Sequence, residues 1–193
     1  MELMTLRTDI ELVELARHGN PQAFKLLILR HQKLVASTVI GMLGNTIEAE
    51  DVGQETFIRF YRALPNFRGD SAVGTYLTRI AINLSLNELK RRKKRSFLSF
   101  FTTSNPKNKN DHEIEMSIPD ETETPEKYDS KELVQKALSC LDPKFRSVVV
   151  LRLVKGYSSQ ETADLLDLPI GTVLSRLARA QDKLKQIIDR LQN

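Results

Sequence analysis

Hydrophobic residues recur at three- and four-residue spacing through the N-terminal half of the chain, the period of a helix that buries one face. The first such stretch begins at Asn20, which can cap free backbone amides ahead of a proline, and stops at Gly44. A second stops before Pro65, and a third runs from Val73 into six consecutive basic residues, KRRKKR, at 90–95. Nothing here alternates with the two-residue period of a strand, so the pattern predicts an all-helical lobe.

The same helical period returns in the C-terminal third. Asp142 precedes a proline and can begin a helix there, and Gly156 can end it. Ser158 and Glu161 have the spacing of a capping box, and Asp167 tolerates the left-handed backbone of a tight turn. The helix after this turn would bury a stripe made of Val173, Leu177, Ala180 and Leu184. Two helices joined by a tight turn predict a helix-turn-helix, with an ordinary helical hairpin as the alternative.

Between these parts, residues 97–129 lose the helical period and contain few apolar residues. From Asp111 to Asp129 there are eight acidic residues and one lysine, a local net charge of −7. Such a composition is typical of a flexible linker that its own charge extends. We therefore predict an all-α protein in which two small helical domains, 1–96 and 130–193, are joined by an acidic linker at 97–129.

Composition narrows the class of protein further. The chain has 193 residues, 40% of them hydrophobic, and its net charge of +4 favours an anionic partner mildly. A single cysteine, Cys140, suits a reducing compartment. We find no signal-peptide core and expect no stretch long enough to span a bilayer, so a cytoplasmic protein without membrane insertion is predicted. Scattered histidines and the lack of a nucleophile–base pair predict neither metal, cofactor nor enzyme.

In a helix-turn-helix the second helix enters the major groove of DNA, with its N-terminal residues at the base edges. Arginine suits bidentate contact with guanine, worth about 1–3 kcal/mol of discrimination. Lysine farther along the helix suits backbone phosphates. These are the candidate contacts on that helix: Thr172, Ser175, Arg176, Arg179 and Lys183.

Two stretches together resemble one protein family. AEDVGQETFIRFYRALPNFRGDSAVGTYLTRIAINLSLNELKRRKKR resembles conserved region 2 of the extracytoplasmic-function (ECF, group IV) sigma factors of bacterial RNA polymerase. ETADLLDLPIGTVLSRLARAQDKL is similar to their region 4. The two matches stand in the family's order around the acidic linker and cover most of the chain. The resemblance implies an alternative sigma factor that binds core polymerase at the beta-prime clamp helices and the beta flap, recognises promoter −35 and −10 elements, and melts the latter.

The resemblance also implies roles for particular residues. The family's clamp-helix docking positions are Asp51, Gln54, Glu55 and Ile58 here, which by pattern alone are a solvated helix face. The loop after Pro65 is similar to the family loop that receives a base flipped out of the promoter, an extrusion that costs a few kcal/mol. The implied −35 contacts add Ala178 to the recognition-helix set, so that the full set is Thr172, Ser175, Arg176, Ala178, Arg179 and Lys183.

The implied −10 surface extends from that loop along the third helix into the basic run, which would hold duplex phosphates. Its residues are Phe67, Arg68, Asp70, Ser71, Tyr76, Arg79, Asn83, Asn87, Lys90, Arg91, Arg92, Lys94 and Arg95. Tyr76 also falls on the apolar stripe and could be a core residue, and the family usually has tryptophan there, so weaker stacking is expected. For the basic run, a solvated helix end and a targeting signal are the alternatives. Leu174 departs from a commonly basic position and leaves an apolar side chain exposed.

Two other function classes remain open at this point. A non-sigma helix-turn-helix regulator would bind DNA without polymerase, and a sigma mimic would only titrate an anti-sigma factor. An anti-sigma partner is expected from the family in any case. The acidic linker would thread through the polymerase, or would serve only as a spacer.

Overall fold

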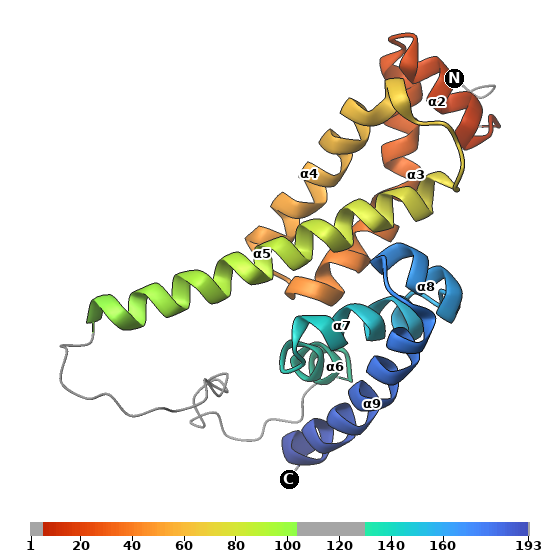
Figure 1. Cartoon of the computed structure of the whole chain (residues 1–193). Helices are drawn as coiled ribbons and strands as arrows, with labels where there is room; N and C mark the ends of the chain where they lie inside the picture. The colour runs from red at the N-terminus through yellow and green to blue at the C-terminus, as the bar shows by residue number, and fades with distance from the viewer. Residues whose placement is uncertain (1–5, 104–129, 193) are drawn as a thin grey trace.

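The computed structural model describes residues 6–103 and 130–192, and every regular element within them is helical (Figure 1), as predicted. The N-terminal lobe consists of α2 (Asp9–Arg17), α3 (Pro21–Leu43), α4 (Ile47–Ala63), the 3-10 turn η1 (Leu64–Asn66) and α5 (Val73–Thr103). The C-terminal lobe consists of α6 (Ser130–Ser139), α7 (Pro143–Val149), the π-helical turn η2 (Val150–Val154), α8 (Ser159–Leu166) and α9 (Ile170–Gln192).

The predicted helix caps are confirmed. Asn20 Oδ1 accepts hydrogen bonds from the amides of Gln22 and Ala23 at 3.0 and 3.2 Å and begins α3. Asp142 caps α7 in the same way, and Ser158 forms the expected capping box at the start of α8. These side chains satisfy amides that have no partner inside their helices, so the local sequence alone sets where each helix begins.

Helix α2 was not predicted, although the sequence holds a signal for it. Thr8 Oγ1 accepts from the amide of Glu11 at 3.3 Å, and Glu11 Oε2 accepts from the amide of Thr8 at 2.7 Å. This is a second capping box. The hydrogen bond from the Thr8 amide holds the pKa of Glu11 below its usual value.

Helix α3 corrects one expectation from the sequence. By length and composition, Pro21–Leu43 is apolar enough to cross a membrane, whereas we expected no such stretch. A core helix of a soluble protein passes the same test. Here α3 packs against α2, α4 and α5 in its own lobe and against α6, α7 and η2 in the other, and 39% of its apolar span is buried inside the protein.

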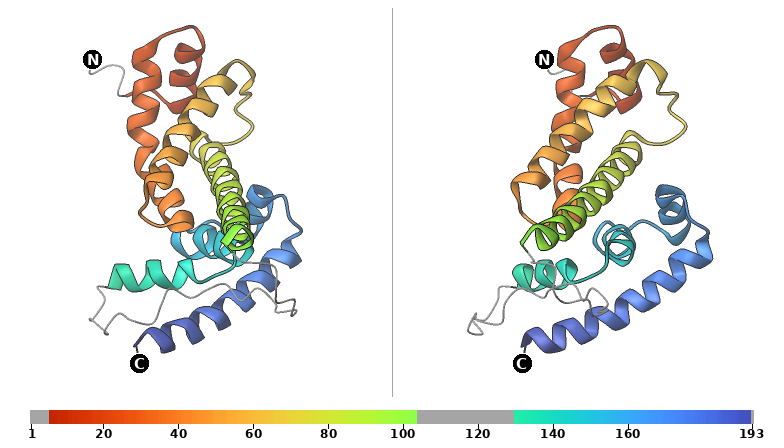
Figure 2. Two further views of the ribbon diagram at one scale, coloured as in Figure 1. Left: turned by 90° about the vertical axis from the view of Figure 1, so that its left-hand side faces the viewer. Right: turned by 60° about the vertical axis from the view of Figure 1, so that its left-hand side comes forward.

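The two lobes lie directly against each other. Figure 2 shows the C-terminal lobe at the end of the N-terminal bundle that is farthest from α2. Val150, Leu151 and Leu165 of the C-terminal lobe belong to the same buried cluster as the core of the N-terminal lobe. The Tyr157 hydroxyl and the Thr78 hydroxyl also share a hydrogen bond of 3.0 Å across the boundary.

The helix-turn-helix is formed by α8 and α9. Asp167 ends α8 with a left-handed backbone (φ 53°), the conformation predicted for the turn. Val173 and Ala180 are fully buried, and Leu177 and Leu184 pack at the edges of the same clusters, so the predicted stripe is confirmed.

Helix α5 continues to Thr103 and so enters the segment predicted as linker from residue 97. The acidic part of that segment, 104–129, lies outside the described residues.

Candidate nucleic-acid interface

The loop between η1 and α5 is anchored by the side chain of Phe67. This ring is only 7% exposed and packs edge-on against Phe60, at 5.7 Å between centroids, and against Tyr76 at 5.1 Å. Phe67 therefore fixes the base of the loop within the core, and Tyr76 is half-buried in the same aromatic cluster. By contrast, Arg68 and Asp70 project into solvent, where Arg68 Nε lies 3.6 Å from Asp70 Oδ2, and Ser71 is half-buried.

A cleft of about 550 Å³ opens beside this loop. One wall is the loop itself, and the other is the end of α2. The lining residues are Glu14, Arg17, Pro65, Asn66, Phe67 and Arg68. Reasoning from the sequence missed Glu14 and Arg17 because it did not predict α2. The Thr8-x-x-Glu11 spacing would have located the helix, but not its position beside a loop about fifty residues away.

Beyond the loop, three polar side chains predicted to meet the −10 strand form one exposed row along α5. Arg79, Asn83 and Asn87 are spaced four residues apart and so share a helix face. Arg79 Nη2 donates a hydrogen bond to the backbone carbonyl of Asp164 in α8, at 3.2 Å. In the arrangement described here, one end of the row is thus in contact with the C-terminal lobe.

A second cleft, of about 370 Å³, lies between α4 and α5. It contains Asp51 and Glu55 of the predicted polymerase-docking face together with Asn87 of the predicted −10 row. Gln54 and Ile58, the other two docking candidates, are exposed on α4. From the sequence, the docking residues and the −10 residues were predicted to form separate surfaces, whereas α4 and α5 bring them to one groove. Arginines pair with three of its carboxylates, Glu48, Glu55 and Glu88.

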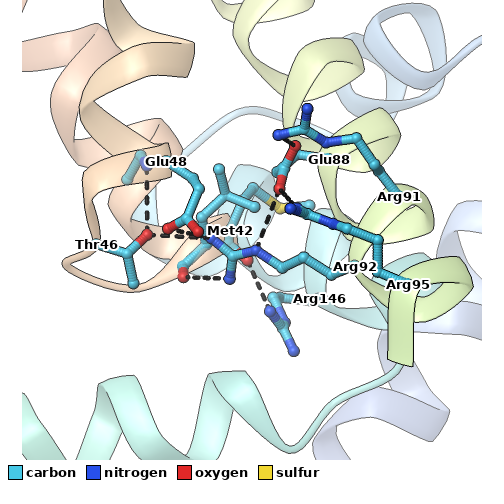
Figure 3. Close-up of polar contacts among 10 residues, drawn as sticks. Met42, Thr46, Glu48, Glu88, Arg91, Arg92, Arg95 and Arg146 are labelled. Carbon is cyan, nitrogen blue, oxygen red and sulfur yellow. Dashed lines mark hydrogen bonds and ion pairs between the residues drawn. The ribbon is translucent and has the colours of Figure 1, made fainter. Parts of the chain in front are cut away.

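The arginines of the basic run gather on one buried carboxylate (Figure 3). Glu88 is 7% exposed, and Arg91 Nη2 lies 2.7 Å from its Oε2. Arg92 Nε and Arg95 Nη2 lie 3.4 and 3.1 Å from its Oε1. Arg91 and Arg95 keep more than half of their side-chain surface exposed, so both can still face a phosphate.

Arg92 differs from its neighbours because its guanidinium points inward. It donates to the Leu43 carbonyl at 3.4 Å, to Thr46 Oγ1 at 3.1 Å and to Glu48 Oε2 at 3.2 Å, which ties α5 to the α3–α4 junction. The pKa of Glu48 is held below its usual value by its own backbone amide, by Thr46 and by the charge of Arg92. The lysines of the run, Lys90, Lys93 and Lys94, are exposed.

On the recognition helix α9, most predicted DNA contacts are accessible. Ser175, Ala178, Arg179 and Lys183 are exposed, while Thr172 and Arg176 are half-buried. Leu174 is exposed, as its departure from the family pattern predicted. Lys183 Nζ lies 5.2 Å from the centre of the Phe145 ring, so this cation also contacts its own lobe.

Within residues 6–103 and 130–192, no three histidine, cysteine or carboxylate side chains gather in a way that could hold a metal ion.

Comparisons with known proteins agree with the two lobes. The family model for Sigma-70 region 2 matches residues 27–95, and the model for Sigma-70 region 4 matches residues 131–184. The RNA polymerase sigma-H factor of Pseudomonas aeruginosa is 34% identical to the chain over 98% of both sequences. The ECF RNA polymerase sigma-E factor of Escherichia coli is 36% identical over 92% of both.

Two solved structures share the fold. CnrH, solved in complex with the cytosolic domain of CnrY, has a TM-score of 0.65 at 26% identity, and the match covers 94% of this chain and 97% of CnrH. RpoE of Bartonella quintana, solved with the anti-sigma factor NepR, has a TM-score of 0.64 at 21% identity, with 86% and 96% covered. At that identity the second likeness concerns the fold alone.

Proposed function

The chain belongs to the sigma-70 family of RNA polymerase sigma factors, in its ECF group, and on that premise we propose which surface serves each step of promoter use. As a member of this family it is an alternative sigma factor that directs transcription initiation. Its role is to bind and position other molecules, without catalysis of its own, and it acts in the cytoplasm where the polymerase is.

Core polymerase docks on the exposed face of α4. Support comes from the accessibility of Asp51, Gln54 and Ile58 and from the cleft that Asp51 and Glu55 share with α5. Carboxylates there suit a basic partner surface, and Ile58 adds apolar area that is lost from water on docking. The exposed carboxylate of Asp51 is the observation that carries the assignment, since Glu55 is paired with Arg59 on the same helix.

The −10 element is melted and held at the loop cleft and along α5. A flipped base enters the cleft beside Asn66 and Arg68, and the strand continues past Arg79, Asn83 and Asn87. Asparagine offers both a donor and an acceptor to a base edge. The exposed lysines of the basic run, with Arg91 and Arg95, hold the adjacent duplex phosphates.

The −35 element is read by α9 in the major groove. Ser175 and Arg179 face solvent on its N-terminal half, where base edges are contacted, and Lys183 follows at a position suited to phosphate. Exposed Leu174 replaces a polar contact with an apolar one. Such a side chain suits the methyl group of a thymine.

An anti-sigma factor is the third partner that we propose. CnrH, which is similar over nearly its whole length, was solved with the cytosolic domain of CnrY. The cleft between α4 and α5 and the contact between the lobes are both surfaces that such a partner can cover.

Transcription in vitro tests these assignments. Bacterial core polymerase is incubated with a library of promoter fragments, with and without this protein, and the transcripts are sequenced. We expect new transcripts whose promoters share −35 and −10 motifs at fixed spacing. Asp51→Lys and Glu55→Lys should each abolish them without unfolding the protein, whereas Glu132→Lys, an equal charge change at an exposed position on α6, should not.

The outcomes separate the competing functions. A folded protein that starts no transcript on any fragment contradicts the sigma function. DNA binding retained without polymerase would then favour a helix-turn-helix regulator. Binding to an anti-sigma protein alone would favour a sigma mimic.

A further inference from the structure

The backbone of the loop beside the larger cleft accepts hydrogen bonds from one arginine of α2, Arg17. Arg17 Nε donates to the backbone carbonyl of Leu64 at 3.0 Å, and Arg17 Nη2 donates to the carbonyl of Phe67 at 2.5 Å. Its third nitrogen, Nη1, donates to Glu14 Oε1 at 2.6 Å. One guanidinium thus connects the start of η1, the residue just after it, and the preceding turn of α2.

These two carbonyls lie at the two ends of the three-residue turn η1, whose residues Pro65 and Asn66 line the cleft. The Leu64 carbonyl already accepts the turn's own hydrogen bond from the Phe67 amide at 3.2 Å, whereas the Phe67 carbonyl lies just past the turn, where such a group lacks a partner within it. The guanidinium is planar and presents its donors in a fixed fork, so it sets the separation of the two oxygens as well as satisfying them. A lysine ammonium, as a point charge on a flexible stem, cannot impose that separation.

The loop is therefore fixed from two sides. On one side the Phe67 ring is held in the core by Phe60 and Tyr76. On the other, Arg17 holds the backbone and forms part of the cleft wall. The cleft between the loop and α2 has a volume of about 550 Å³, within the range of about 300–1,000 Å³ typical of small-ligand sites. Its wall offers the apolar edge of Pro65 and the exposed guanidinium of Arg68, on which a base can stack.

We propose that Arg17 is a positioning residue for base capture: it keeps the loop at the separation from α2 that an unstacked nucleobase fits. This inference rests on the proposed use of the cleft for a flipped −10 base. Three of its five N–H groups donate to Leu64, Phe67 and Glu14 and hold the guanidinium against the loop, so we assign Arg17 a role that acts through the loop.

The chain offers a matched control. Arg30 has nearly the same side-chain exposure as Arg17, 30% against 28%. Like Arg17, it contacts a carboxylate, that of Asp9 at 2.8 Å, and donates to a backbone carbonyl, that of Arg7 at 2.7 Å. Replacing Arg30 therefore removes comparable interactions from the same lobe at a place outside the cleft lining.

The experiment measures binding of the complete protein, with core polymerase, to promoter DNA that is already unpaired over the −10 element. Each −10 position is tested twice, once with its base and once as an abasic sugar. Four proteins are compared: wild type, Arg17→Ala, Arg17→Lys and Arg30→Ala. Thermal unfolding of each protein verifies the fold, and Arg17→Lys serves if Arg17→Ala does not fold.

For the wild type, we expect removal of one base to weaken binding about tenfold, the size of one stacked base. Arg17→Ala should lose about the same factor on intact DNA and nothing more on the abasic DNA. Arg17→Lys should fall between, and Arg30→Ala should keep the wild-type ratio of intact to abasic binding. A purely structural role would lower binding to both DNAs equally.

Two results would overturn the inference in distinguishable ways. If Arg17→Ala keeps the wild-type ratio, Arg17 does not position the loop, although base capture stands. If no abasic position weakens the wild type, base capture at this cleft fails and the role of Arg17 fails with it.

Discussion

Arg146 of α7 donates a hydrogen bond through Nη1 to the backbone carbonyl of Met42, at 2.6 Å, near the end of α3 in the other lobe (Figure 3). The same guanidinium donates to the carbonyls of Leu141, at 3.0 Å, and Ser139. Burial lowers the pKa of Arg146, which is 6% exposed. A positive charge at a helix C-terminus interacts favourably with the helix dipole, so this contact holds the lobes together.

Arg146→Ala should lower the free energy of unfolding by about 2–4 kcal/mol, because it leaves buried carbonyls of both lobes without a donor. Urea unfolding followed by circular dichroism measures the loss. Lys144→Ala, an exposed position on the same helix, removes only a contact of the ammonium with the Phe145 ring, 5.1 Å from its centre, and should cost at most about 1 kcal/mol. Equal unfolding midpoints for Arg146→Ala and the wild type would contradict the structural role of this contact.

The lobes also meet where α3 has no side chain. A Cβ atom at Gly41 would lie 3.1 and 3.2 Å from the two methyl groups of Val150, closer than such atoms normally approach. Gly41→Ala favours the helix itself by about 1 kcal/mol. We nevertheless expect Gly41→Ala to separate the lobes, because Val150 is β-branched and its χ1 angle is restricted, so its methyl groups cannot rotate away from the new Cβ atom.

Small-angle X-ray scattering measures this separation as a larger radius of gyration for Gly41→Ala. Shortening the facing side chain in the double variant Gly41→Ala/Val150→Ala should restore the wild-type radius. If the single variant keeps the wild-type radius, the lobes have room to adjust. If the double variant stays expanded, Val150 is not the obstacle.

The local features of the fold could be predicted from the sequence because their causes are local. Asn20, Asp142 and Ser158 cap helices within three residues of themselves, and Asp167 provides the turn between α8 and α9 by its own backbone conformation. The capping box of Thr8 and Glu11 belongs to the same class and was overlooked.

Contacts between distant residues could not be predicted from the sequence. The sequence around Gly41 does not indicate that it meets Val150. Likewise, no residue spacing relates Arg17 to the carbonyls of Leu64 and Phe67. The basic run illustrates the same limit at the candidate site. The six adjacent cations are equivalent in the sequence, but each lies on a different side of the helix, and that side decides its contacts. Arg92 points inward.

This difference within the basic run predicts two separable phenotypes. Lys94→Ala removes an exposed cation and should reduce the slope of log affinity against log salt concentration by about 0.9, the effect of one phosphate contact. Arg92→Ala should leave that slope unchanged and lower the free energy of unfolding by about 1–3 kcal/mol, since it loses internal hydrogen bonds.

Salt titrations of promoter binding by the polymerase complex, paired with urea unfolding of the free protein, measure both effects. Lys25→Ala, an exposed lysine on α3, serves as the control and should alter neither. A reduced salt slope for Arg92→Ala would show that its guanidinium leaves the α3–α4 junction to meet DNA.

The contacts of Asp9 predict how stability depends on pH. Its Oδ1 accepts from Arg30 Nη1 at 2.8 Å, and its Oδ2 lies 2.7 Å from His31 Nε2. Burial raises the pKa of Asp9, but the hydrogen bonds from Arg30 and His31 and their charges outweigh it, so the pKa lies below its ordinary value. The stabilisation is therefore present above about pH 4, the ordinary pKa of an aspartate, and is lost as pH falls through the lower pKa of the folded state.

Asp9→Asn should thus cost roughly 1 kcal/mol at pH 7, a value reduced by the partial exposure of the carboxylate. The difference in unfolding free energy between wild type and Asp9→Asn should shrink below about pH 4. Urea unfolding of both proteins from pH 7 to pH 2.5 measures it, and the lowered pKa values of Glu11, Glu48 and Glu161 cancel in the subtraction. A difference that stays constant over this range would mean that the Asp9 contacts stabilise the protein independently of its charge.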